Sequence, residues 1–170
     1  MTKPFLFAIV VLEREVKKMR INFDMDGTIA NLYGVENWLD CLINEDAYPY
    51  AVAETLVNMN VLARYLNKLQ KMGCEIGIIS WLAKNGADEY NREVTRVKKN
   101  WIKKHLRSIK FDYVEIVEYG YCKNEFCGSD EDILFDDEKN NREEWTGKAF
   151  DETEILKVLK ELIENRGALN

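Results

Sequence analysis

Apolar and polar positions alternate along the chain in blocks that predict strands and helices in turn. Short apolar runs typical of buried strands lie at residues 20–23, 74–80, 111–117 and 132–135. Longer segments with apolar residues at helical spacing lie at about 51–72, 87–106 and 151–167. Gly73 ends the first of them, and Asp151, with Glu154 three residues later, can cap the last. This alternation predicts an α/β domain with a mainly parallel sheet.

A length of 170 residues predicts one domain with room for a small insert. We expect residues 19–170 to form that domain, with a short cap-like insert at about 31–60. Residues 1–18 are an N-terminal extension of open status: the apolar run 5–12 is either an added element, or the natural start is Met19. The run is too short to cross a bilayer, which takes about 20 residues. Charged residues follow it where a signal-peptide cleavage site needs small ones, so no export is predicted.

Composition and charge narrow the class of partner. Hydrophobic residues make up 46% of the chain, enough for a core, and the formal net charge is −6. An acidic chain is repelled by nucleic-acid backbones and anionic membranes, so we expect a small phosphorylated substrate and no membrane partner, and the charge disfavours nucleic acid without excluding it. Four cysteines without a Cys-x-x-Cys pair, and one histidine, do not support a zinc site. Reduced cysteines, with Cys74 buried in a strand, fit a cytoplasmic protein.

Acidic residues follow the first and fourth predicted strands directly. Asp24 and Asp26 stand in INFDMDGTIA, and Asp136 and Asp137 stand in DILFDD. Parallel strands end at one edge of a sheet, so the two pairs should meet although they are more than a hundred residues apart. Clustered carboxylates repel unless a cation joins them, and oxygen ligands suit Mg²⁺. The alternative is that each pair only opens a turn.

Two further polar residues are expected at the same edge. Ser80 ends the second strand, where its hydroxyl can hold a phosphoryl oxygen, although a serine after a strand more often caps a helix. Lys123 follows the third strand, where its cation can balance the carboxylates and a transferring phosphoryl group. By itself such a lysine is more often a solvated surface charge.

These residues together resemble the motifs of the haloacid dehalogenase superfamily. DMDGT, starting at Asp24, is similar in full to the first motif, DxDGT. Ser80 after GII looks like the second motif, Lys123 the third, and Asp136-Asp137 after ILF the fourth. The resemblance covers residues 20 to about 141.

Other lysines compete with Lys123 for the third motif. They are Lys98, Lys99, Lys103 and Lys104. We expect them in the middle of the preceding helix, on the wrong side of the third strand, and therefore prefer Lys123.

The resemblance implies a Rossmann-like three-layer sandwich and a covalent mechanism. Asp24 would attack phosphorus and form an aspartyl-phosphate. Asp26 would protonate the leaving oxygen and then deprotonate the attacking water. Mg²⁺ would be held by Asp24, the main-chain carbonyl of Asp26 and Asp136, with Asp137 helping directly or through water.

Substrate choice would depend on the short insert, which contains Tyr33, Trp38, Tyr48 and Tyr50. These rings either stack on a base or form the core of a two-helix cap. The short cap, the SW pair after the second strand and the DDE-x-N ending are similar to 5′-nucleotidase-like branches of the superfamily. So small a cap leaves the site open or closed by a second subunit, as in a homo-oligomer.

Three functions are consistent with these residues, in order of preference. The first is hydrolysis of a small phosphate monoester such as a nucleoside monophosphate. The second keeps the site but acts on a sugar phosphate or a nucleic-acid 3′-phosphate end. The third, a non-catalytic binding module, would be marked by loss of Asp24 or Asp26, and both are present.

Overall fold

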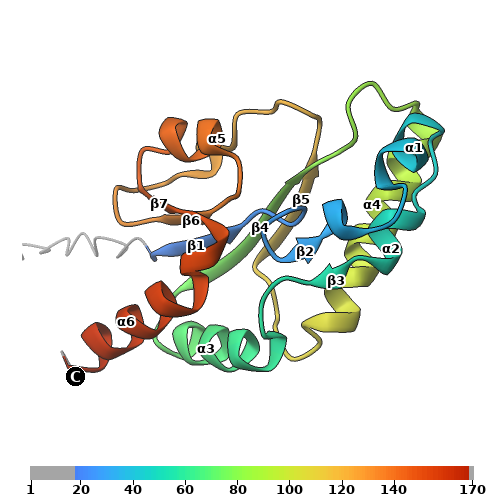
Figure 1. Cartoon of the computed structure of the whole chain (residues 1–170). Coiled ribbons are helices and arrows are strands. Elements are labelled where there is room, and N and C mark those ends of the chain that lie inside the picture. The colour runs from blue at the N-terminus through green and yellow to red at the C-terminus, as the bar shows by residue number, and fades with distance from the viewer. Residues whose placement is uncertain (1–17, 169–170) are drawn as a thin grey trace, which may run out of the picture.

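A five-stranded parallel sheet forms the centre of the computed structural model, which describes residues 18–168 (Figure 1). Its strand order is β5-β4-β1-β6-β7, and every pairing is parallel. The strands are β1 (Arg20–Phe23), β4 (Glu75–Trp81), β5 (Tyr113–Val117), β6 (Ile133–Phe135) and β7 (Lys148–Phe150). The predicted α/β class is confirmed, and β7 was not predicted. The prediction about residues 5–12 lies outside the described residues.

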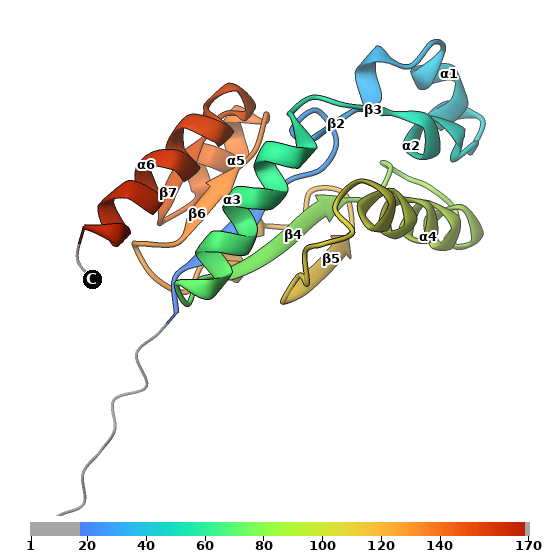
Figure 2. The same ribbon diagram turned by 90° about the horizontal axis from the view of Figure 1, so that it is seen from below.

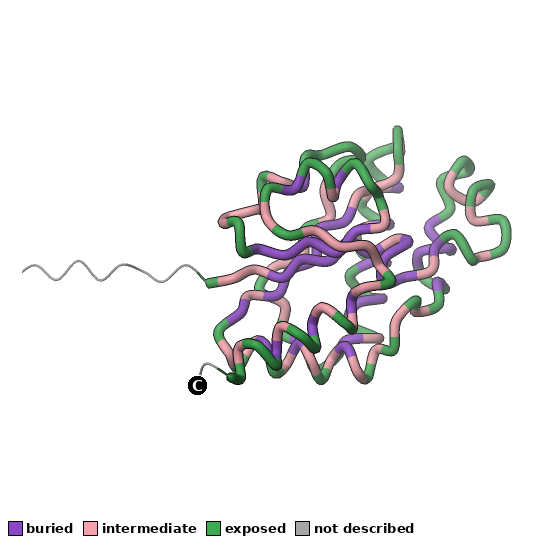
Figure 3. The backbone as a smooth tube through the Cα atoms, turned by 60° about the vertical axis from the view of Figure 1, so that its left-hand side comes forward, coloured by how far each residue is buried: buried purple, intermediate pink, exposed green. Residues whose placement is uncertain are grey.

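Helices cover both faces of the sheet, which makes the predicted three-layer sandwich (Figure 2). One face carries α3 (Met59–Lys71), α4 (Asp88–His105) and α6 (Ile155–Gly167), whose apolar residues share one core. The short helix α5 (Lys139–Glu144) and the 3₁₀ turn η2 (Lys123–Phe126) lie over the other face. Figure 3 shows that the central strands are buried along most of their length. No helix among residues 18–168 is long and apolar enough to cross a membrane.

Strand register brings the ends of β1 and β6 together. Ile21 and Phe23 point into the larger core because side chains alternate along a strand. Phe23 pairs with Phe135 in the ladder, and their rings stack at 5.0 Å. The residues directly after them, Asp24 and Asp136, therefore leave the sheet side by side.

The insert after the first motif is a small lobe on a two-stranded stem. The stem pairs β2 (Ala30–Asn31) with β3 (Glu54–Thr55), antiparallel. Between them lie η1 (Leu32–Gly34), α1 (Trp38–Ile43) and α2 (Tyr48–Val52). Leu32 and Tyr50 pack on Tyr90 and Val94 of α4, which holds the lobe at the carboxyl end of the sheet.

Two predicted helix starts were wrong. The helix predicted over 51–72 includes part of the stem, and α3 begins only at Met59. Asn58 caps this helix, because its side-chain oxygen accepts hydrogen bonds from the N–H groups of Asn60 and Val61. The prediction relied on apolar spacing and did not use this capping residue. Asp151 does cap a helical segment, but it accepts the Thr153 N–H of a 3₁₀ turn (η3, Glu152–Glu154) before α6 starts.

Candidate active site

The carboxylates of Asp24 and Asp136 share one lysine at the carboxyl edge of the sheet. The Lys123 Nζ atom lies 2.7 Å from Asp24 Oδ1 and 2.7 Å from Asp136 Oδ2. All three side chains are at least nine-tenths buried. Burial alone would lower the pKa of Lys123, but the two carboxylates outweigh it and raise that pKa, so the lysine stays charged. Lys123 thus occupies the place predicted for it.

Asp136 is held by further donors that the sequence did not single out. Its carboxylate accepts the side-chain amide of Asn141, at 3.1 and 3.2 Å, and the N–H of Glu138. Arg142 Nη1 lies 2.7 Å from the main-chain oxygens of both Asp136 and Asp137. Asn141 lies in the first turn of α5, five residues after Asp136, and this i+5 spacing is the signal that could have found it. Asp136 is therefore fixed before any ligand binds.

Thr28 joins the first and fourth motifs. Its Oγ1 accepts the N–H of Asp137 at 3.0 Å and lies 3.2 Å from Asp137 Oδ1 and 3.4 Å from Asp24 Oδ2. The single hydroxyl proton can go to either carboxylate. Gly27 makes the turn with a φ of +79°, and a Cβ there would collide with the Asp137 carboxylate. Glycine is thus required both by the backbone and by the space that Asp137 fills.

Three carboxylates form a cluster that could hold a metal ion. Oxygens of Asp24, Asp136 and Asp137 all lie within 4.8 Å of one another. Burial, and then the charge of Asp24, raises the pKa of Asp136 to about 6 and that of Asp137 to about 7. Lys123 alone does not balance this negative charge. The donor set is all oxygen, which fits Mg²⁺. The Asp26 carboxylate is not a member of the cluster.

Asp26 and Ser80 lie instead around a different lysine, Lys98. The Lys98 Nζ atom contacts the Asp26 carboxylate, lies 3.1 Å from Ser80 Oγ, and lies 2.6 Å from the main-chain oxygen of Trp81. The interpretation that Lys98 lies on the wrong side of the third strand was wrong, because α4 packs across the sheet face and its middle turn reaches the site. The other lysines named with it (Lys99, Lys103 and Lys104) do not line the site.

A pocket of about 320 Å³ opens above the carboxylates and is lined by aromatic rings. Tyr33 and Trp38 of the insert form an edge-to-face pair on one wall. Trp81 and Tyr119 form a second pair, with centroids 5.2 Å apart, and were not predicted. The Trp81 ring also lies 5.0 Å from Lys123 Nζ, so the pocket is continuous with the charged site.

The other two predicted substrate rings, Tyr48 and Tyr50, do not present an accessible ring face to this pocket. Tyr48 is 56% exposed and does not line it. Tyr50 borders the pocket, but it is only 2% exposed and packs in the core between the insert and α4. Of the four rings, Tyr33 and Trp38 are therefore the ones that can meet a ligand.

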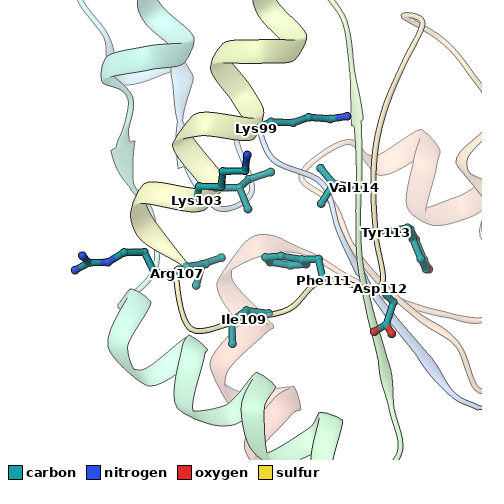
Figure 4. Close-up of a pocket in the computed structure, with 10 residues that line it drawn as sticks. Lys99, Lys103, Arg107, Ile109, Phe111, Asp112, Tyr113 and Val114 are labelled. Atoms are coloured by element: carbon teal, nitrogen blue, oxygen red, sulfur yellow. The ribbon is translucent and has the colours of Figure 1, made fainter.

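A larger cavity, about 590 Å³, lies elsewhere, between the end of α4 and the start of β5 (Figure 4). Phe111, Ile109 and Val114 line it, and Lys99 and Lys103 stand at its rim. It lies at the amino end of β5, whereas ligands of parallel α/β sheets bind at the carboxyl ends. None of the motif residues lines it. Its size therefore does not make it the candidate site.

The sequence matches no known family model, and no curated protein matches it significantly. Among solved structures, a D,D-heptose 1,7-bisphosphate phosphatase from Burkholderia thailandensis is similar over 74% of this chain and 70% of that chain. The identity is 10% and the TM-score is 0.44. A similarity this distant has no weight for function. The function is therefore inferred from the strand order and from the side-chain contacts at the carboxyl edge of the sheet.

Proposed function

We propose that the protein is a Mg²⁺-dependent phosphohydrolase of the haloacid dehalogenase superfamily, with Asp24 as its nucleophile. The observation that supports this most directly is the Lys123 ammonium held between Asp24 and Asp136 at the carboxyl edge of the sheet. A carboxylate in that position has its charge partly neutralised and its orientation fixed, which suits attack on a phosphoryl group. The DMDGT motif supports the same assignment.

In this proposal Asp24 and Asp26 carry out the hydrolysis in two steps. An Asp24 oxygen forms a bond to phosphorus while the P–O bond to the leaving group breaks, and Asp26 gives the leaving oxygen a proton. A water molecule then attacks phosphorus of the aspartyl-phosphate and gives a proton to Asp26, while the bond between phosphorus and the Asp24 oxygen breaks. Phosphate leaves, and the Asp24 carboxylate is restored. Asp26 is suited to both transfers because burial raises its pKa despite the neighbouring Lys98.

Two polar side chains would bind the phosphoryl oxygens. The Lys123 ammonium would stabilise the negative charge, first on the Asp24 carboxylate and then on the oxygens of the transferred phosphoryl group. Ser80 is 1% exposed, and its Oγ accepts from Lys98, so its own proton is free to be donated to a phosphoryl oxygen.

The cluster of Asp24, Asp136 and Asp137, with the main-chain carbonyl of Asp26, would hold Mg²⁺. When bound, the ion would neutralise the charge of the carboxylates and of the phosphoryl group. Asn141 and Glu138 would keep Asp136 in place for it.

The substrate that the pocket favours is a small monoester with a planar ring, such as a nucleoside monophosphate. The pocket's volume, about 320 Å³, is at the small end of the usual range for ligand pockets, about 300–1,000 Å³. Two ring pairs line the pocket, Tyr33 with Trp38 and Trp81 with Tyr119, and offer faces and edges for a base to stack on. A sugar phosphate or a nucleic-acid 3′-phosphate end is the second candidate substrate, and a non-catalytic binding module is the least favoured function.

A substrate panel tests the proposal. The purified protein with Mg²⁺ should release phosphate from nucleoside monophosphates faster than from sugar phosphates or a 3′-phosphorylated oligonucleotide. Asp24→Asn should abolish release from all of them, whereas Asp130→Asn, at an exposed aspartate, should not. No release from any ester by wild-type protein would refute the proposed function, and release by Asp24→Asn would refute the nucleophile.

A further inference from the structure

Lys98 is a buried lysine to which the four motifs assign no role. It projects from the middle of α4, and its side chain is 0% exposed. Its three N–H groups have three acceptors: the Asp26 carboxylate, Ser80 Oγ at 3.1 Å and the Trp81 main-chain oxygen at 2.6 Å. The Tyr50 ring covers it, with Nζ 4.9 Å from the centroid. Every donor of the ammonium is therefore used.

Such a lysine is costly, and helix packing alone does not require it. Its neighbours on the same side of α4 are apolar, among them Val94, Val97 and Trp101. A hydrophobic residue of similar volume is often as stabilising as a buried ion pair, or more so. Its side-chain partners, in contrast, are Asp26 and Ser80, two site residues that Lys123 does not touch. The two lysines divide the site: Lys123 holds Asp24 and Asp136, and Lys98 holds Asp26 and Ser80.

We infer that Lys98 is a positioning residue that fixes the Asp26 carboxyl group for proton transfer to the leaving group. This inference rests on the proposed phosphatase function. Lys98 takes Asp26 Oδ2, so the proton is transferred through Oδ1. Trp81 and Tyr50 hold the ammonium in turn, so the insert and β4 both fix its place.

A positioning role for Lys98 predicts a dependence on the leaving group. An alkoxide leaving group needs the proton that Asp26 supplies, whereas dinitrophenolate leaves without one. Lys98→Met should lower kcat/KM, which reports formation of the aspartyl-phosphate and not its hydrolysis, by roughly 100-fold or more for an alkyl phosphate, within the range of a lost general acid. For 2,4-dinitrophenyl phosphate the loss should be less than about tenfold, below that range. Lys98→Gln, whose amide keeps a donor, should fall between wild type and Lys98→Met. Lys99→Met, on the exposed side of the same helix, is the matched control and should change neither rate.

A double variant decides the matter even if Lys98→Met folds poorly. In Lys98→Met with Asp26→Asn neither partner is charged, which removes the penalty of an unpaired ion. If Lys98 acts through Asp26, the double variant should match Asp26→Asn on both substrates within about threefold, the usual limit of additivity errors. A further tenfold loss in the double variant, or an equal loss on both substrates in Lys98→Met, would overturn the inference. An inactive wild-type protein would instead refute the proposed function.

Discussion

Lys123 and Asp24 are 99 residues apart in the chain, and their Nζ and Oδ1 atoms lie 2.7 Å apart. The lysine stands at the start of η2, in the connection between β5 and β6, and reaches the end of β1. The same Nζ atom contacts Asp136, so one cation offsets the repulsion between two buried carboxylates. Stability and chemistry therefore depend on the same side chain.

Lys123→Met should weaken the fold and the activity together. Loss of the ammonium leaves two buried carboxylates unpaired, which typically costs about 3–5 kcal/mol. Urea unfolding without metal measures that loss. Lys139→Met breaks an exposed pair with Glu143 and should cost less than about 1 kcal/mol. Equal unfolding free energies for the two variants would show that Lys123 does not offset the repulsion.

Asp26→Asn should slow turnover without removing the nucleophile. Proton transfer is worth about 10²–10⁴-fold, so kcat should fall by that much while KM changes little. Beryllium fluoride should still bind at Asp24 in a crystal of the variant, because Lys123 and Asp136 are unaltered. Rates near wild type would assign proton transfer to another group, and beryllium fluoride found elsewhere would contradict Asp24 as the nucleophile.

The stability of the metal-free protein should fall as pH rises from about 4 to 7. Burial, and then Asp24, raises the pKa of Asp137 from 3.8 to about 7, so between these values the folded state binds more protons than the unfolded state. Asp137→Asn removes this linkage and should melt higher than wild type above pH 7 in EDTA. With Mg²⁺ the order should reverse, because the ionised carboxylate is a ligand. Parallel melting curves against pH, with and without metal, measure both effects.

Activity itself should require Mg²⁺, Mn²⁺ or Co²⁺. The cluster of Asp24, Asp136 and Asp137 offers only oxygen donors. The single positive charge of Lys123 does not neutralise three carboxylates. Chelation should therefore abolish turnover, and added Mg²⁺ should restore it. Full activity in excess EDTA, with no metal found by mass spectrometry, would contradict the proposed metal site.

The sequence predicted the residues at strand ends better than those that reach the site from a helix face. Asp24 and Asp136 were placed correctly next to each other because strand ends converge by topology, whatever the helices do. Lys98 was excluded because position along the chain does not show which turn of a long helix faces the sheet. Its helical neighbours Val94, Val97 and Trp101 are apolar, so the spacing favours the buried side of α4, but only the structure shows which groups Lys98 meets there.

Aromatic residues of the insert show a similar limit. Tyr33, Trp38, Tyr48 and Tyr50 lie within eighteen positions, and their types do not distinguish a ring that meets a ligand from one that fills a core. The second ring pair, Trp81 and Tyr119, lies at and just after the ends of β4 and β5, and Trp81 of the SW pair was not predicted to meet a ligand.

The last prediction separates substrate contact from packing among these rings. Trp38→Ala should raise KM for a nucleoside monophosphate roughly 5–150-fold, since stacking on a base is worth about 1–3 kcal/mol. It should barely change KM for p-nitrophenyl phosphate, which needs only the charged site. Tyr50→Ala should instead lower the unfolding free energy by about 3–5 kcal/mol and weaken both substrates, because that ring is 2% exposed. Tyr48→Ala, at a ring outside the pocket, is the control and should change neither. If Trp38→Ala weakens both substrates in proportion to its loss of melting temperature, the ring belongs to the core of the insert, and a nucleotide substrate loses its support while the phosphatase proposal remains.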